Sequence, residues 1–138
     1  MDLKNLDMEK AAEKGAFLHF EHPVNGEKLY AEDENGNPDH ERPIGVTLVG
    51  TDSSAFRRKV SEIANRSMGK RQKSRTVERS DAEASELVAA CTIGVHNIVI
   101  DGEVIKLKDM EHVYTKYRWM REQADEFIGD RRNFFMLA

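Results

Sequence analysis

Two Asx-Gly pairs, Asn25-Gly26 and Asp101-Gly102, each stand between short apolar segments and constrain the possible folds of this chain. Such a pair favours a two-residue β-hairpin turn, because both central positions of a type I′ turn need a positive φ angle. The predicted strands are residues 16–22 and 28–30 around the first pair, and 97–100 and 104–107 around the second. The chain should therefore contain a small antiparallel sheet.

The segments after the first hairpin differ sharply in composition. Residues 31–43 combine acidic residues with Asn, Gly and Pro, which predicts an acidic loop. Residues 44–50 (IGVTLVG) are rich in β-branched residues and predict a further strand. Thr51, Asp52 or Ser53 can then cap a helix by accepting hydrogen bonds from the free N–H groups of its first turn.

Apolar residues recur at helical spacing in four places. A short helix is predicted over residues 3–14, and a second one begins after Ser53. A third should start near Ser80, with Glu83 completing a capping box, and end at Gly94. A single last helix is predicted from Asp109 onward. The predicted inward-facing residues are Phe56, Val60, Ile63 and Ala64; Leu87, Val88 and Cys91; and Val113, Tyr117, Met120, Ala124 and Phe127.

Length and composition favour one domain with a modest core. Leu, Ile, Val and Phe number 31 of 138 residues, about 22%, just above the roughly 20% at which disorder becomes common. We expect an α+β fold in which a small antiparallel sheet of β-hairpins packs against two or three amphipathic helices. The expected organisation is an N-terminal arm or short helix over 1–14, one domain over 15–130 with a basic linker over 67–79, and an apolar tail over 131–138.

The net charge of −4 conceals a basic segment. Residues 1–56 carry −7, residues 57–79 carry +7 and residues 80–138 carry −4. Such a segment could bind nucleic acid, although it has no internal aromatic residue to stack on bases. A solvated helix face with a flexible linker is the simpler interpretation, and attraction to an acidic protein surface is a third. The candidate partner-binding bases are Arg57, Arg58, Lys70, Arg71, Lys73 and Arg75.

No recognisable catalytic or metal-binding set is present in the sequence. His19 and His22 are three residues apart on a predicted strand, so they should face opposite sides. The single cysteine, Cys91, lies on an apolar helix face, which favours a buried thiol over a nucleophile. Glycine-rich phosphate-binding loops are absent. We therefore expect a protein that is not an enzyme and uses no metal or cofactor.

The aromatic residues near the C-terminus divide into two groups. Tyr117, Trp119 and Phe127 lie on the last predicted helix and are assigned to folding. Phe134 and Phe135 follow that helix almost at the chain end, where residues usually fray unless something holds them. They either fold back on the core or bind a partner, and we take them as candidate partner-binding residues.

Several motifs occur in a distinctive order over about residues 15–135: an early hairpin, IGVTLVGTDSSAFRR, LVAACTIGVHNI before the Asp-Gly turn, and YRWMREQADEFIGDRRNFF. This order resembles the tail assembly chaperones of long-tailed bacteriophages and prophages. Val95 departs from that pattern, because an aromatic residue is expected after Gly94. The residues most specific for the resemblance are Asp52, Ser53, Arg57, Asn65, Arg66, Trp119, Glu122, Gln123, Phe127, Ile128, Asp130, Arg131, Asn133 and Phe134.

The resemblance implies a non-enzymatic protein that binds the tape-measure protein, keeps it soluble and helps to recruit subunits of the major tail-tube protein. It also implies self-association, a location in the host cell cytoplasm and absence from the mature virion. Membrane association is not expected, because no apolar run is long enough to span a bilayer and no signal-peptide pattern is present. The alternatives are a permanent small tail-completion or connector component and, less favoured, a nucleic-acid-binding regulator.

Overall fold

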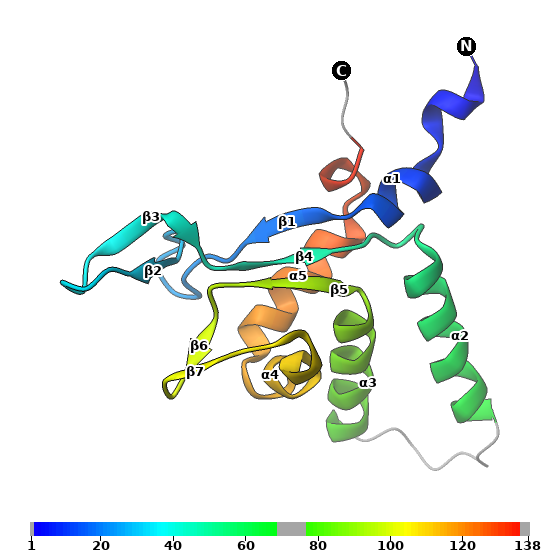
Figure 1. Ribbon diagram of the computed structural model, residues 1–138. Helices are drawn as coiled ribbons and strands as arrows, with labels where there is room; N and C mark the ends of the chain where they lie inside the picture. Colours follow the sequence, from blue (N-terminus) through cyan, green and yellow to red (C-terminus); the bar gives the residue numbers. More distant parts are fainter. Residues whose placement is uncertain (1, 69–76, 136–138) are drawn as a thin grey trace.

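The computed structural model describes residues 2–68 and 77–135. Helices and small antiparallel sheets form the predicted α+β fold (Figure 1). The helices are α1 (Met8–Lys14), α2 (Ser54–Met68), α3 (Val77–Ala90), α4 (Met110–Lys116) and α5 (Arg118–Gly129), with 3₁₀ turns η1 (Leu3–Leu6), η2 (Leu107–Asp109) and η3 (Arg131–Asn133). The strands are β1 (Ala16–His19), β2 (Tyr30–Glu32), β3 (Pro38–Pro43), β4 (Gly45–Leu48), β5 (Thr92–His96), β6 (Val99–Ile100) and β7 (Glu103–Val104).

The central sheet has three antiparallel strands in the order β1–β4–β5. Strand β4 confirms the β-branched strand predicted from the sequence, and its Val46 and Leu48 side chains are fully buried. Strand β1 approaches β4 very closely: a Cβ atom at Gly45 would lie 2.1 Å from the carbonyl oxygen of Leu18. Only glycine fits at this crossing without moving the backbone of one strand.

Strand β5 occupies a segment that the sequence assigned to a helix. The prediction that the third helix ends at Gly94 is wrong, because α3 ends at Ala90 and Gly94 pairs with Thr47 of β4. A Cβ atom at Gly94 would lie 3.3 Å from the Cβ of Thr47, so this glycine allows close strand pairing. Helix α3 also starts at Val77, which places Ser80 inside the helix and contradicts the predicted capping box.

The first predicted hairpin turn is present but longer than a type I′ turn. Glu21 and Lys28 form an isolated β-bridge, and Nδ1 of His22 accepts hydrogen bonds from the backbone N–H groups of Val24 and Asn25 at 3.1 and 3.3 Å. Among the described residues, Asn97 and Asp101 alone of the non-glycine residues have a positive φ, so Asn25 does not adopt the type I′ conformation.

Two further hairpins project from the same side of the molecule (Figure 1). Strands β2 and β3 pair antiparallel where an acidic loop was predicted, so that prediction is wrong. These strands carry carboxylates and little apolar alternation, which hides such a hairpin from hydrophobic periodicity. Strands β6 and β7 confirm the second Asx-Gly turn, with φ of 51° at Asp101 and 79° at Gly102.

The last helix is two helices rather than the single one predicted. Helix α4 ends before Tyr117, whose φ of −103° and ψ of 74° are not helical, and α5 starts at the next residue. Helices α3, α4 and α5 contribute buried side chains to the same cluster as the sheet. Arg121 of α5 is 7% exposed and donates hydrogen bonds to the carbonyl and carboxylate oxygens of Asp81 on α3 at 3.2 and 3.0 Å.

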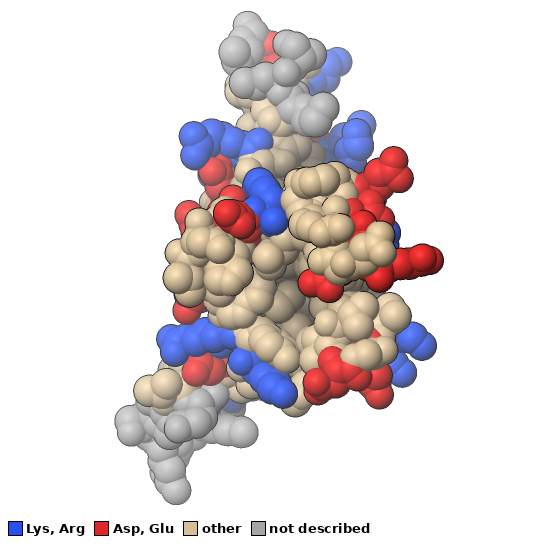
Figure 2. Space-filling view, turned by 90° about the vertical axis from the view of Figure 1, so that its left-hand side faces the viewer, with Lys and Arg blue, Asp and Glu red and all other residues tan. Residues whose placement is uncertain are grey.

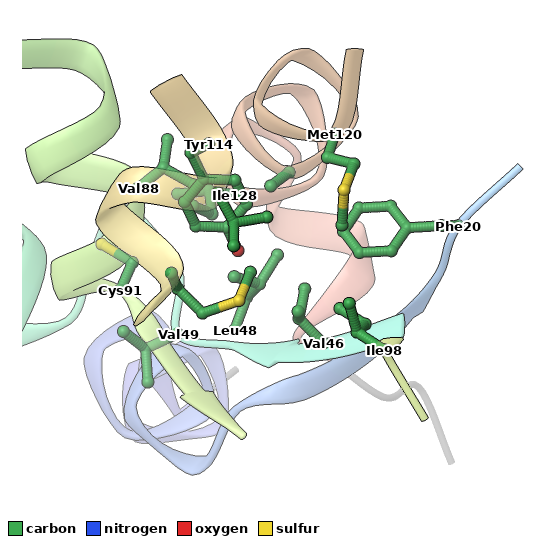
Figure 3. Packing of buried hydrophobic residues seen from close by; sticks show 13 residues of the cluster. Phe20, Val46, Leu48, Val49, Val88, Cys91, Ile98, Tyr114, Met120 and Ile128 are labelled. Carbon is green, nitrogen blue, oxygen red and sulfur yellow. The ribbon is translucent and has the colours of Figure 1, made fainter. Parts of the chain in front are cut away.

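The core lies between the central sheet and these three helices (Figure 3). Sheet residues meet helix residues across this layer, and a buried hydroxyl pair joins Tyr114 to Thr92 at 2.8 Å. The fully enclosed cluster contains Phe20, Val46, Leu48, Val49, Val88, Cys91, Ile98, Met110, Val113, Tyr114, Met120, Ala124 and Ile128. Val88 and Cys91 are buried as predicted, and Leu87 packs against the cluster.

Candidate interaction surface

An apolar groove of about 370 Å³ opens between the β6–β7 hairpin and the junction of α4 with α5. Aliphatic side chains form one wall, and Tyr117 and Trp119 form the other. The complete lining is Leu29, Ile44, Ile98, Val99, Ile100, Asp101, Tyr117, Trp119 and Met120. Figure 2 looks at the side from which the two hairpins project and shows a hollow bordered mainly by uncharged side chains. The groove is therefore an apolar depression on the surface.

Local conformation places both walls. Two positive φ angles at the Asp101-Gly102 turn fold β6 back on β7, which presents Val99 at the rim. The break at Tyr117 separates α4 from α5 and brings Tyr117 and Trp119 to the same opening. The Trp119 ring contacts the buried Phe20 ring edge to face, with centroids 6.0 Å apart, so the aromatic wall is anchored to the core.

The hairpin beside this groove exposes apolar side chains. Val99 is 55% exposed, Val104 is 70% exposed and Leu107, just after β7, is 47% exposed. Single exposed aliphatic side chains are common, but three on one short segment next to an apolar groove extend the apolar surface beyond it.

The two projecting hairpins are acidic. The β2–β3 and β6–β7 segments carry the carboxylates of Glu32, Asp33, Glu34, Asp39, Glu41, Asp101 and Glu103, against one guanidinium, Arg42. Figure 2 shows acidic side chains mainly along the right-hand border of this face, with basic ones more frequent on its left. A partner that fills the groove would meet an apolar centre, with the carboxylates of the hairpins on one border and Lys116, 5.7 Å from the centroid of the Tyr117 ring, on the other.

The predicted basic site is divided between described and undescribed residues. Lys70, Arg71, Lys73 and Arg75 lie outside the described residues. Arg57 forms an ion pair with Glu9 at 2.9 Å, and Arg58 is exposed on the same helix. Further along α2, Arg66 forms an ion pair with Glu86 of α3, which holds the pKa of that carboxyl below its usual value. Arg57 and Arg66 are therefore paired within the chain.

Phe134 folds back on the domain, which is the alternative to partner binding that the sequence left open. Its side chain is 8% exposed, and its ring lies edge to face with Phe127 at 5.5 Å. It also fills the space beside Gly50, whose Cβ, if present, would lie 3.0 Å from the ring. Phe134 therefore packs within the domain, and its assignment as a partner-binding residue stays a prediction. Phe135 is half-buried.

Tyr117 and Trp119 were assigned to folding alone, and sequence reasoning missed their place beside an open groove. A signal was available in the β6–β7 hairpin, where Ile98, Val99 and Ile100 are consecutive and do not alternate with polar residues. A two-stranded hairpin can bury one face only, so three apolar residues in a row leave at least one exposed.

Two observations concern the nucleophilic and metal-ligating side chains of the described residues. Burial raises the pKa of the Cys91 thiol to about 12, which makes it a poor nucleophile. Within residues 2–68 and 77–135, no group of three or more His, Cys, Asp or Glu side chains is arranged to hold a metal ion. Helices in the same ranges are too short or too polar to cross a bilayer.

Comparisons with known proteins found no match: no family model, no curated protein and no solved structure is significantly similar to this chain.

Proposed function

We propose that this protein is a phage tail assembly chaperone that binds the tape-measure protein, keeps it soluble and helps to recruit tail-tube subunits. The observation that supports this proposal best is the apolar groove between the β6–β7 hairpin and the aromatic wall of Tyr117 and Trp119. In this proposal the protein acts in the host cell cytoplasm, self-associates on its client and leaves before the virion is complete.

The physical argument starts from the client. A long helical protein carries an apolar stripe, which aggregates unless another surface covers it. An amphipathic helix binds by placing its apolar stripe in a hydrophobic groove, with contacts at helical spacing. A groove of about 370 Å³ accepts a few side chains and not a whole helix, so each copy would cover a short stretch. Many copies with weak individual contacts suit a repetitive client that must later be released.

The acidic hairpins favour a particular kind of stripe. Carboxylates on the hairpin side of the groove attract lysine or arginine residues on the flank of an apolar stripe that faces the hairpins, and they repel an acidic flank there. We therefore expect the bound stretches to have basic residues beside their apolar positions. The attraction should weaken as salt concentration rises, because exposed charges are screened beyond about 10 Å at 0.1 M salt.

The test is co-expression with the tape-measure protein encoded nearby, with the soluble fraction of that protein as the readout. Val99→Glu places a charge at the rim of the groove, and Leu3→Glu is the matched control, because Leu3 is 74% exposed on η1. The wild-type chain and Leu3→Glu should keep the client soluble, whereas Val99→Glu should not.

Two results would contradict this proposal in different ways. A client that is equally soluble with and without the wild-type chain would rule out the chaperone function. A client that is rescued equally by Val99→Glu would leave the chaperone function standing but would exclude the groove as its binding surface. Detection of the chain in purified particles would instead favour a permanent tail component.

A further inference from the structure

A second groove, of about 660 Å³, runs between β1 and α5 on a different part of the surface. Residues of β1 line one side, residues of α5 together with Asp130 and Asn133 line the other, and the turn after Glu21 contributes further lining residues. The lining residues are Phe17, Leu18, His19, Glu21, His22, Pro23, Val24, Gly26, Lys28, Gln123, Glu126, Phe127, Asp130 and Asn133.

Strand β1 is an edge strand of the central sheet, so one of its two sides has no neighbouring strand. The N–H group of Phe20, just after β1, donates to the carbonyl of Ile44 at 3.0 Å. Because backbone groups alternate in direction along a strand, those of Leu18 point toward β4, and those of Phe20 point to the same side, where its carbonyl accepts from the N–H of Leu29 at 3.0 Å. Phe17, His19 and Glu21 direct theirs the other way, toward the side where the groove lies.

One of these outward pairs is already bonded to a side chain of α5. Oε1 of Gln123 accepts a hydrogen bond from the backbone N–H of Glu21 at 3.0 Å. Nε2 of Gln123 donates to the carbonyl of Glu21 at 2.8 Å. A carboxamide that bonds both groups of one residue reproduces the pair of bonds that a neighbouring antiparallel strand would make. The chain thus carries a one-residue substitute for a fourth strand at the end of the groove.

The residues on the two sides of the groove would determine which side chains an added strand should carry. Side chains of such a strand alternate between the helix side of the sheet and its open side. On the helix side they would meet the exposed carboxylate of Glu126. On the open side they would lie next to Phe17, which is 40% exposed. Basic residues therefore suit the positions that face the helix side, and apolar residues suit the positions that face the open side.

The net charge of the lining supports the same choice. Glu21, Glu126 and Asp130 contribute three carboxylates and Lys28 contributes one ammonium group, and Asp130 is ion-paired with Arg132 at 2.8 Å. Lys28 is already paired with Glu21 at 3.2 Å. Glu126 is the one carboxylate of the lining with no ion pair among the described residues, so a basic segment is electrostatically complementary to the groove at Glu126.

We propose that the outer edge of β1 is a strand-addition site, at which an extended segment of a partner protein with alternating basic and apolar residues pairs with Phe17 and His19. Main-chain hydrogen bonds to these two residues supply affinity, and Glu126 and Phe17 supply selectivity. The added strand would continue the ladder that Gln123 begins at Glu21. This inference does not depend on the proposed chaperone function, because it concerns a different groove and an extended segment.

The first test uses a nine-residue synthetic peptide that alternates lysine and valine, with the full chain labelled for amide NMR. Addition of the peptide should shift the amide signals of Phe17 and His19. The amide of Leu18 is the internal control, because it already points toward β4. A peptide with glutamate in place of lysine should bind at least about tenfold more weakly, a difference of about 1.4 kcal/mol.

Two N-methylated forms of the peptide test the ladder itself. One is methylated on every lysine nitrogen of the backbone and the other on every valine nitrogen. Only alternate N–H groups of an added strand face β1, so one form should lose binding and the other should keep it. Equal binding of both forms would overturn the proposal, as would unchanged Phe17 and His19 signals.

Substitutions in the chain give a second, independent test of the proposed site. Phe17→Ala and Phe17→Pro both remove the ring, but only proline also removes the outward N–H group, so only Phe17→Pro should abolish binding. Glu126→Lys should weaken binding of the lysine peptide, whereas Glu103→Lys on β7 should not. Equal loss in Glu126→Lys and Glu103→Lys would show a general charge effect and would contradict the site.

Discussion

The hydroxyl groups of Thr92 and Tyr114 form a buried pair whose removal, one partner at a time, should have unequal effects. Thr92 is 4% exposed and Tyr114 is fully buried. Oγ1 of Thr92 donates to the carbonyl of Val88 at 2.8 Å, which uses its only hydrogen. Tyr114 must therefore donate the 2.8 Å hydrogen bond that joins the two hydroxyls.

The direction of this hydrogen bond determines how much each substitution should lower the free energy of unfolding. Tyr114→Phe removes the donor and leaves Thr92 bonded to Val88, so it should lower the free energy of unfolding by about 0.5–1.5 kcal/mol. Thr92→Val keeps the shape of the side chain but leaves the Tyr114 hydroxyl buried without an acceptor, which costs about 1–3 kcal/mol. The carbonyl of Val88 still accepts from the N–H of Cys91 at 3.2 Å, so it adds no further penalty.

The double variant Thr92→Val/Tyr114→Phe separates this account from a simple loss of contacts. Removing both hydroxyls leaves no unsatisfied donor, so the double variant should be more stable than Thr92→Val alone. Urea denaturation of the wild type, both single variants and the double variant gives the four free energies of unfolding that are needed. Additive single effects, or a Tyr114→Phe variant less stable than Thr92→Val, would refute the assigned direction of donation.

Three shorter predictions concern other buried or paired groups. The Ser85 hydroxyl is fully buried and has no hydrogen-bond partner among the described residues. Ser85→Ala should therefore raise the free energy of unfolding, measured by urea denaturation, by up to about 1 kcal/mol, and a less stable variant would contradict this prediction. Hydrogen bonds from Arg131 lower the pKa of Asp52 in the folded state, so the stability they add is present above the ordinary pKa of the carboxyl and is lost as pH falls through the lowered pKa. The unfolding curves of Asp52→Asn and wild type should therefore differ at pH 7 and approach each other as the medium becomes strongly acidic. Because the Cys91 thiol is buried with a pKa of about 12, it should react with a chromogenic disulfide at pH 7.5 only in denaturant, and fast labelling of the native protein would show that the site opens.

The sequence predicted the parts of the fold where local chemistry and packing agree. The β-branched segment became β4, because alternate residues there face a core. The Asp101-Gly102 pair became a type I′ turn, because both residues adopt positive φ. The cap at Ser53 was also correct, since its Oγ accepts from the N–H of Phe56 at 3.2 Å.

The errors share a different physical cause, which is that tertiary packing outweighs local pattern. Gly94 resembled a helix stop, but it lies in β5. Glycine is needed there because a larger residue would press on Thr47 of the neighbouring strand. The stripe from Val113 to Phe127 fits one helix, yet Tyr117 breaks it so that α4 and α5 can each pack on the core. The apolar groove depends on that break, so periodicity alone could not have located it.

Helix α2 stands at one end of the molecule beside α3 (Figure 1), and its attachment has a consequence for local unfolding. No side chain is buried over residues 54–66 of α2; Ala55 and Phe56 pack against the core cluster from the first turn, and polar contacts join the helix to α1 and α3. Its amide hydrogens should therefore exchange with solvent through a local opening that leaves the core closed, whereas those of β4 should exchange only on global unfolding. Salt should speed the first process more than the second, because it screens the ion pairs that hold α2, and α2 should then open before the core does.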